Sequence, residues 1–311
     1  MKISRREMTT ALALGLGAAV THALPAPRPT PPPRPARKIK IGYTCITWGA
    51  FPRGAEAAAT LEPALRDIAA LGFHSFETFP EVLEDWDGRD ALRPLMDRYD
   101  LPLSAGYLRI NLSDPDARKD NLAQIIRSAK LVKKYGGTFG VFGPNGVKRE
   151  AFDFQARRAN IVSALNDAAM ALADVGLGAG LHPHTGTPVE TRDEVYAVME
   201  SVDPKHMKFA PDVGQLQKGG MDAAKVVKDF LPLVRHVHLK DWDGGPHFGG
   251  YCPLGRGKVD VAAVLDMVEG VDVPVTAMVE LDPSKDAPLS PLEAARITKD
   301  HLQKLGYGFR G

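Results

Sequence analysis

The chain has 311 residues, of which 44% are hydrophobic and 25% are charged, and its 39 lysines and arginines nearly balance its 38 aspartates and glutamates. This composition is typical of a globular protein and excludes a collagen-like, coiled-coil or low-complexity chain. A net charge of +1 gives no field that would gather phosphate backbones, so we expect no nucleic-acid partner.

Residues 1–23 have the pattern of an export signal: a basic start, an apolar run and a small-x-small cleavage site. The apolar run is about half of the ~20 residues that a bilayer-spanning helix needs, so we expect no stable membrane anchor. Arg5 and Arg6, before a core diluted by alanine and glycine, resemble a twin-arginine signal. We therefore expect the twin-arginine export machinery as a partner and a periplasmic or secreted location. A general secretory signal is the alternative.

Residues 24–37 form a Pro-rich linker that holds neither a helix nor a central strand, because proline lacks the backbone N–H and fixes φ. We expect a semi-rigid tether. Removal of residues 1–23 takes away Lys2, Arg5, Arg6 and Glu7, a net +2, which leaves a mature chain of about −1. The argument against nucleic acid therefore also holds for the mature chain.

From Lys38 to Gly311 the chain alternates between short apolar or β-branched runs and longer amphipathic stretches. Strands are predicted at residues 38–47, 74–79, 101–108, 138–143, 177–184, 207–214, 235–241 and 276–282. Helices are predicted at residues 61–71, 90–100, 116–135, 155–175, 191–201, 223–231 and 261–269. Eight such units in ~270 residues predict a single-domain (β/α)8 TIM barrel. An open α/β sheet is the alternative, but no glycine-rich phosphate turn follows the first strand.

Polar residues follow several of the predicted strands. Glu77 ends the second strand, and the later strand ends carry His182, Asp212, His238 and Glu280. In a barrel these ends build the active site. Because buried carboxylates and imidazoles without partners are costly, we expect these four later residues to share one divalent cation. Two nitrogens and two carboxylates suit Mn²⁺, our first choice, or Co²⁺, Fe²⁺ or Zn²⁺ better than Mg²⁺ or Ca²⁺.

Each of these residues has an alternative role. His184 lies on the same strand face as His182, so either one can be the ligand, and the other can contact substrate. Asp212 can instead cap the next helix. Lys240 shares a face with His238, which suits an acid/base role or a contact behind the ligands. Trp48 can form a wall for a sugar ring, although core packing is the usual place for tryptophan.

The chain from Lys38 to Gly306 resembles the xylose-isomerase-like barrel superfamily of sugar isomerases, epimerases and keto-inositol dehydratases. The resemblance is carried by GFHSFET (72–78), LHPHTGTPVET (181–191), FAPDVGQLQKGG (209–220), RHVHLKDWD (235–243), PLGRGKVD (253–260) and MVELDPS (278–284). It implies one divalent metal, held by residues of strands five to eight and bound by oxygens of a sugar or keto-polyol. Matching the motifs assigns the metal to His182, Asp212, His238 and Glu280.

Two residues depart from this pattern. Many isomerases of the superfamily have Glu where His182 stands, and the HxHxGT form is more similar to the keto-inositol dehydratase branch. Gln215 stands where a histidine usually follows the aspartate, and we expect it, with His184, Trp48 and Arg256, to contact substrate.

We expect a metal-dependent sugar isomerase or epimerase that removes a proton next to a metal-bound carbonyl of a keto- or aldo-sugar. Glu280 is the predicted base, with Lys240 or Glu77 as its acid/base partner. The alternative is a lyase that dehydrates a keto-sugar or keto-inositol. An apurinic-type endonuclease and a metal-free carbohydrate-binding barrel are weaker alternatives. The oligomeric state stays open.

Overall fold

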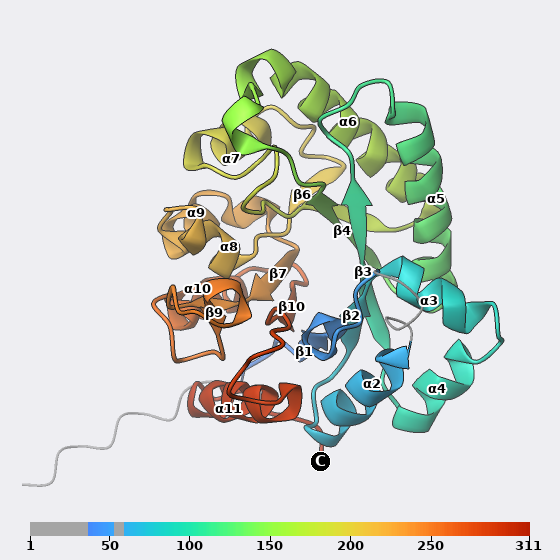
Figure 1. Ribbon diagram of the computed structural model, residues 1–311, viewed down its shortest axis with the longest axis vertical. Coiled ribbons are helices and arrows are strands. Elements are labelled where there is room, and N and C mark those ends of the chain that lie inside the picture. The colour runs from blue at the N-terminus through green and yellow to red at the C-terminus, as the bar shows by residue number, and fades with distance from the viewer. Residues whose placement is uncertain (1–36, 53–58) are drawn as a thin grey trace, which may run out of the picture. The chain divides into compact units, whose positions relative to one another are not determined.

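The computed structural model describes residues 37–52 and 59–311 (Figure 1). The predicted export signal and all of the predicted Pro-rich linker except Arg37 lie outside the described residues. Of the helices in the described part of the chain, none is long and apolar enough to cross a membrane.

The first described residues, just before the first strand, contact residues from near the other end of the chain. The Arg37 guanidinium pairs with Asp266 at 2.7 Å. The backbone N–H groups of Lys38 and Ile39 donate hydrogen bonds to the Glu269 carboxylate at 3.0 and 3.1 Å. Asp266 and Glu269 belong to the helix α10 (Val261–Glu269), so these contacts fix the start of the first strand against that helix.

Eight parallel strands form the barrel wall, in the order β6-β5-β4-β3-β2-β1-β10-β7. They are β1 (Ile41–Thr44), β2 (Phe76–Thr78), β3 (Leu103–Ile110), β4 (Phe139–Pro144), β5 (Gly178–Leu181), β6 (Met207–Phe209), β7 (His236–Leu239) and β10 (Thr276–Val279). Two isolated parallel bridges, Phe209 with Val234 and Asp212 with His238, join β6 to β7 and close the ring. The predicted (β/α)8 fold is confirmed, and each predicted strand overlaps one of these strands.

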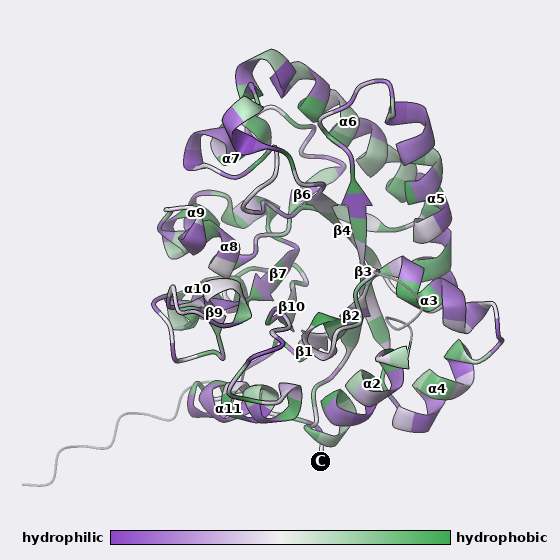
Figure 2. Ribbon diagram, in the orientation of Figure 1, coloured by the Kyte–Doolittle hydropathy of each residue, from purple (hydrophilic) through white to green (hydrophobic). Residues whose placement is uncertain are grey.

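Helices follow the strands around the outside of the barrel (Figure 1). They are α2 (Leu61–Ala70), α3 (Pro80–Asp87), α4 (Leu92–Tyr99), α5 (Arg118–Lys134), α6 (Phe154–Val175), α7 (Arg192–Met199), α8 (Val213–Lys218), α9 (Ala223–Asp229), α10 (Val261–Glu269) and α11 (Pro291–Lys304). Hydrophobic and hydrophilic residues alternate along the outer helices, as Figure 2 shows for α5 and α6. This is the pattern of helices that bury one face against a sheet.

Among the helices of the described residues, three were not predicted: α3, α8 and α11. The signal for α11 is present in the sequence, since Ser290 and Glu293 form a capping box and Pro291 occupies the first turn. A short hairpin, β8 (Asp241–Trp242) and β9 (Tyr251–Cys252), also extends the loop after β7.

The barrel interior is packed with side chains rather than open. The Phe139 ring fills the lower interior because Gly178 and Gly180 carry no side chains there; a Cβ at either would lie 2.7 or 2.8 Å from the ring. His236 stacks on this ring with a centroid distance of 5.5 Å. The polar residues at the carboxyl ends of the strands therefore pack on a layer of side chains that fills the barrel interior.

Candidate active site

Four strand ends bring the predicted metal ligands together. His182 follows β5, Asp212 follows β6, His238 lies in β7 and Glu280 follows β10. Ligand atoms of the first three lie within 4.8 Å of one another. The Nδ1 atom of His238 is 3.1 Å from Oε2 of Glu280. The four side chains, predicted from distant parts of the sequence, thus occupy one place at the carboxyl ends of the strands.

The donor atoms of this group fit a divalent cation. Both ring nitrogens of His182 and Oδ2 of Asp212 are buried and have no hydrogen-bond partner among the described residues. Buried polar atoms in proteins nearly always have a partner, and a cation would provide one. Burial, followed by the charge on His238, lowers the pKa of His182 well below its ordinary value, which keeps it in the neutral form that binds metals.

Asp212 combines the two roles that the sequence offered. Its Oδ1 caps α8 by accepting hydrogen bonds from the N–H groups of Gly214 and Gln215 at 2.8 and 2.9 Å. Its Oδ2 remains directed at the group of ligand atoms. Burial raises the pKa of Asp212 to about 6, although Lys240 opposes the shift. The helix cap fixes one oxygen and leaves the other for a cation.

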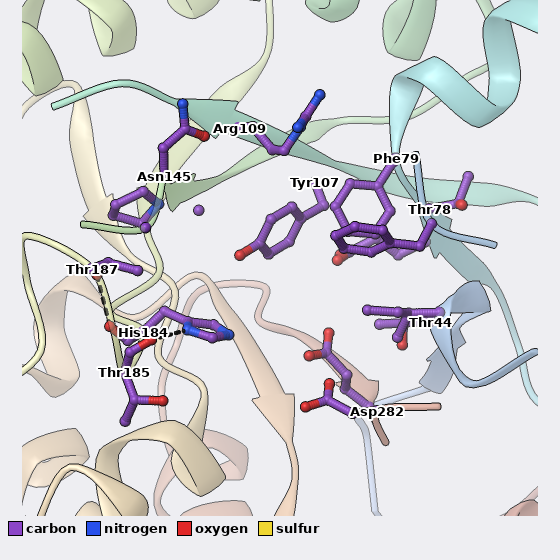
Figure 3. A pocket seen from close by; sticks show the side chains of 17 residues that line it. Thr44, Thr78, Phe79, Tyr107, Arg109, Asn145, His184, Thr185, Thr187 and Asp282 are labelled. Atoms are coloured by element: carbon purple, nitrogen blue, oxygen red, sulfur yellow. Dashed lines mark hydrogen bonds between the residues drawn. The ribbon is translucent and has the colours of Figure 1, made fainter. Parts of the chain in front are cut away.

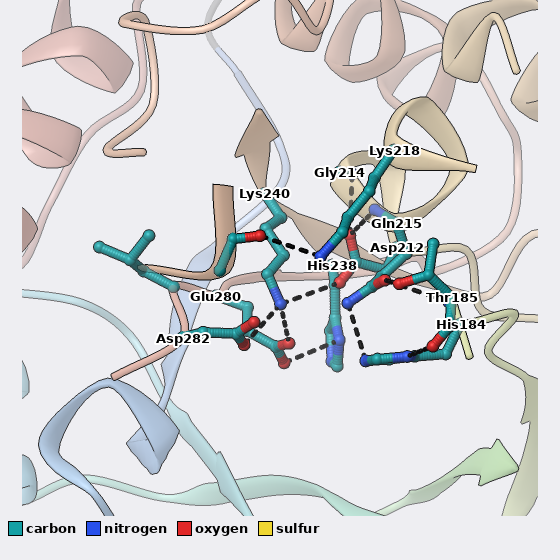
Figure 4. Close-up of polar contacts among 12 residues, drawn as sticks. His184, Thr185, Asp212, Gly214, Gln215, Lys218, His238, Lys240, Glu280 and Asp282 are labelled. Atoms are coloured by element: carbon teal, nitrogen blue, oxygen red, sulfur yellow. Dashed lines mark hydrogen bonds and ion pairs between the residues drawn. The ribbon is translucent and has the colours of Figure 1, made fainter. Parts of the chain in front are cut away.

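Lys240 lies behind two of the candidate ligands (Figure 4). It is fully buried, and its Nζ lies 2.8 Å from Glu280, 2.8 Å from Asp282 and 3.6 Å from Asp212. Burial favours the neutral amine, but these three carboxylates raise the pKa of Lys240 well above its ordinary value. Lys240 and His238 in turn hold the pKa of Glu280 well below its usual range against the effect of burial. The site therefore contains a fixed ammonium group and an ionised glutamate.

Glu77 lies between two histidines of β7. Its Oε1 is 2.8 Å from Nε2 of His238, and its Oε2 is 3.0 Å from Nε2 of His236. The carboxylate is 1% exposed. Burial opposes ionisation, but His238 and His236 lower the pKa of Glu77 to about 2. Glu77 borders the cavity described below, yet it turns both oxygens toward imidazole rings.

His184 is held by a closed set of hydrogen bonds. Its Nδ1 donates to the carbonyl of Thr185 at 2.7 Å, and its Nε2 accepts from the Gln215 amide at 2.8 Å. The amide oxygen of Gln215 accepts from the hydroxyl of Thr185 at 2.8 Å. Because both His184 nitrogens are occupied, the geometry favours His182 over His184 as the ligand. Gln215 is 2% exposed and supports His184, in place of the direct substrate contact that we expected.

A cavity of about 470 Å³ opens above these groups (Figure 3). One wall is aromatic, where Phe51, Phe79 and Tyr107 pack in sequence with centroid distances of 4.9 Å. His184 and Asp282 contribute polar groups to the other side. An aromatic surface facing polar groups suits a sugar or polyol ring.

Tyr107 is a site residue that the sequence reasoning missed. Its ring packs edge-on against His182 and stacks on His238, at 5.1 and 6.3 Å. A Cβ at Gly143 would lie 2.0 Å from the Tyr107 hydroxyl, so the ring requires glycine at this position. The signal was present, since Tyr107 lies in a predicted strand two residues after Ala105, which also faces the barrel interior.

Two predicted substrate contacts lie elsewhere. Trp48 donates a hydrogen bond to Asp67 at 2.9 Å and packs edge-on against Tyr43, and it is not among the described residues that line the cavity. Its place is the usual one for tryptophan, at the edge of the core. Arg256 is exposed and borders a separate pocket of about 150 Å³ beside the β8–β9 hairpin. Neither residue is among the described residues that line this cavity, because strand-end position in the sequence does not determine which way a loop turns; a substrate contact by either one stays a prediction.

Asp241 explains why the loop after β7 has its glycine-rich motif. Its carboxylate is 1% exposed and accepts hydrogen bonds from the N–H groups of Trp242, Gly255, Gly257 and Val259 at 2.9 to 3.1 Å. A Cβ at Gly257 would lie 2.1 Å from the carboxylate. This aspartate therefore organises the loop and does not face the cavity.

Comparison with known proteins agrees with this fold. Residues 65–305 match the family described as xylose isomerase-like TIM barrel. The chain is 24% identical over 197 residues to an inosose dehydratase of Geobacillus kaustophilus; this stretch covers 58% of the chain and 62% of that relative, less than two thirds of its length.

Two solved structures share the fold. One is a 3-keto-D-glucoside 4-epimerase from E. coli, with a TM-score of 0.63, 19% identity, and coverage of 86% of this chain and 99% of that one. The other is the IOLI protein with a bound zinc atom, with a TM-score of 0.67, 16% identity, and coverage of 86% and 98%.

Proposed function

Because the chain belongs to the xylose isomerase-like TIM barrel family, we propose that it is a divalent-metal-dependent enzyme that removes a proton beside a carbonyl of a neutral keto-sugar or keto-polyol. The observation that carries this proposal is the gathering of His182, Asp212, His238 and Glu280 beneath one cavity, with buried ligand atoms that lack partners. A divalent cation held there would polarise the substrate carbonyl and make the neighbouring carbon more acidic. Mn²⁺ is our first choice, and Zn²⁺, Co²⁺ and Fe²⁺ suit the same donors.

Glu280 is the proposed base. It is ionised and borders the cavity, and Lys240 holds its Oε1 at 2.8 Å, which fixes the direction of the carboxylate. Lys240 is an ammonium group that can return a proton through Glu280 or Asp282 but cannot accept one. This arrangement assigns proton abstraction to the glutamate and leaves the lysine to control its charge and position.

The charges around the cavity favour a substrate without phosphate or carboxylate groups. The acidic residues Glu280 and Asp282 border it. Arg109 is the cation among the described lining residues, and its guanidinium is already paired with Glu81 at 2.8 Å. Lys240 is enclosed by carboxylates. A neutral polyhydroxy ring therefore fits this cavity better than a sugar phosphate.

Isomerisation or epimerisation is the first candidate outcome of the proton abstraction. Tyr107 enters the cavity from β3, whereas Glu280 follows β10, so a proton-bearing hydroxyl and a proton-accepting carboxylate approach from two walls. Dehydration is the second candidate. It is favoured by His182, because many isomerases of the family that the chain resembles have a glutamate there, and by the sequence similarity to an inosose dehydratase.

The test combines metal analysis with a substrate screen in heavy water. Purified protein is incubated with neutral keto-sugars and a keto-inositol, and proton NMR follows the carbon beside the carbonyl. Deuterium uptake without loss of water supports isomerisation or epimerisation, and loss of a hydroxyl with a new conjugated carbonyl absorbance supports dehydration. Glu280→Gln is expected to abolish exchange, and Trp48→Phe, which lies outside the cavity, is expected to retain it. A protein that binds no divalent metal and exchanges no proton with any of these compounds contradicts the proposal.

We also propose export through the twin-arginine route, on the basis of Arg5 and Arg6 in the sequence. Folding before transport lets the cell load the cation before the protein leaves the cytoplasm. Replacing both arginines by lysine is expected to retain the precursor inside the cell, as measured by cell fractionation and the mass of the mature chain. Unchanged processing of that variant contradicts this route.

A further inference from the structure

His238 is placed between two carboxylates on opposite sides of its ring. Its Nδ1 lies 3.1 Å from Glu280, one of the proposed ligands, and its Nε2 lies 2.8 Å from Glu77. The histidine is fully buried, and Glu77 is 1% exposed. Of the two ring nitrogens, only Nδ1 faces the group of ligand atoms around Glu280, so the orientation of this ring decides whether it can bind a cation.

Glu77 is itself prevented from turning. Its second oxygen lies 3.0 Å from Nε2 of His236, and the His236 ring stacks on Phe139 with an angle of 11° between the planes. Phe139 in turn fits into the space left by Gly180. A chain of contacts therefore runs from the packed barrel floor to His238.

Two other roles for Glu77 fit the geometry less well. As a base it would need an oxygen that can meet substrate, but Glu77 is 1% exposed against 7% for Glu280, and its two oxygens contact two histidines that would have to move aside. As a ligand of a second cation, with His236 and His238, it would offer donor atoms at a suitable spacing. The contacts of 2.8 and 3.0 Å are equally those of a carboxylate that accepts hydrogen bonds from two imidazole rings, which needs no second ion.

We propose that Glu77 and His236 are positioning residues that hold the His238 ring with Nδ1 toward the metal site. A carboxylate that accepts the N–H of a histidine ligand fixes the ring and its tautomer and makes the other nitrogen a better donor. This inference rests on the proposed metal site and assigns Glu77 a different task from the acid/base role that the sequence predicted. His182 and Asp212 do not depend on this support, because other elements hold them.

The test compares metal affinity in the full chain and four variants: Glu77→Gln, Glu77→Asp, His236→Gln and Asp67→Asn. Glu77→Gln keeps the volume but removes the charged acceptor, and it is expected to weaken Mn²⁺ and Co²⁺ binding roughly 10- to 100-fold. Glu77→Asp keeps the charge and is expected to recover part of that affinity. The matched control is Asp67→Asn, which removes another buried carboxylate that accepts hydrogen bonds from Trp48 and Arg66, away from the cavity. We expect its metal affinity to equal that of the wild type.

Affinity is measured by chelator competition, and the visible absorption bands of the Co²⁺-loaded proteins report the ligand field directly. A shifted spectrum in Glu77→Gln, together with an unchanged spectrum in Asp67→Asn, supports the positioning role in a way that a general loss of stability does not. Circular dichroism of the metal-free proteins confirms that each variant is folded. If Glu77→Gln does not fold, the metal affinities of Glu77→Asp and His236→Gln are compared with that of the wild type instead. The positioning role predicts that both variants bind metal more weakly than the wild type.

Three results would overturn the inference. Equal affinity and equal spectra in the wild type and Glu77→Gln would remove the positioning role while the proposed function stands. Two cations per wild-type chain, with one lost in Glu77→Gln, would make Glu77 a ligand. A wild-type protein that binds no divalent cation would refute the proposed function and this inference together.

Discussion

Replacing Lys240 by methionine tests whether its ammonium group is the built-in counter-charge of the site. Methionine preserves most of the volume but leaves Glu280, Asp282 and Asp212 without their shared cation. Removing one partner of a buried ion pair typically costs about 3–5 kcal/mol. For a domain of this size each kcal/mol lowers the melting temperature by roughly 2–4 °C, so we expect a decrease of roughly 6–20 °C in the metal-free protein.

A divalent cation is expected to restore part of this loss, because it neutralises the same carboxylates. The wild type should therefore gain less from added metal than Lys240→Met does. Thermal unfolding followed by circular dichroism, with chelator and with saturating Mn²⁺, measures both effects.

Lys218→Met is the matched control. Lys218 also lies over the Tyr251 ring, at 4.8 Å against 4.3 Å for Lys240, but it is exposed and hydrogen bonds to a backbone carbonyl. Its loss is expected to cost within roughly 0.5 kcal/mol. If metal-free Lys240→Met has the same melting temperature as metal-free Lys218→Met, the reasoning is refuted, because the three carboxylates would then need no counter-charge.

Three further predictions concern separate parts of the structure. Metal affinity is expected to fall as pH drops through about 6, because Asp212 takes up a proton there and must release it to bind a cation; calorimetry that shows constant affinity across that range would contradict this. Gly143→Ala is expected to destabilise the fold by about 1–3 kcal/mol by displacing the Tyr107 ring, whereas Tyr107→Phe leaves the free energy of unfolding nearly unchanged; denaturant unfolding distinguishes the two. Asp241→Asn is expected to cost about 2 kcal/mol and to expose the loop after β7 to proteases, because a charged acceptor of four N–H groups is lost; an unchanged cleavage pattern would show that the loop holds itself.

The fold was accessible from the sequence because each strand is a short apolar run between amphipathic stretches. That pattern gave the eight strands and the carboxyl ends at which His182, Asp212, His238 and Glu280 meet. The two-residue period of a strand places such residues on the inward face, and the closure of the barrel brings the carboxyl ends of the strands together.

Contacts between distant loops were not accessible in the same way. Whether Trp48 meets the cavity depends on the turn after β1, where Asp67 of α2 captures its N–H. The partners of Glu77 depend on how the second and seventh strands face each other across the barrel. Lys240 shows the same limit, because its three carboxylate partners come from two other strand ends.

The junction between β6 and β7 is the least paired part of the wall. Two backbone hydrogen bonds bridge it, from Arg235 to Phe209 at 3.2 Å and from His238 to the carbonyl of Pro211 at 2.9 Å. Asp212 and His238 lie on opposite sides of this junction. A cation bound by both residues would link β6 to β7 across this junction. Metal binding would then also stabilise the closure of the barrel, and amide hydrogen exchange along these two strands would become slower.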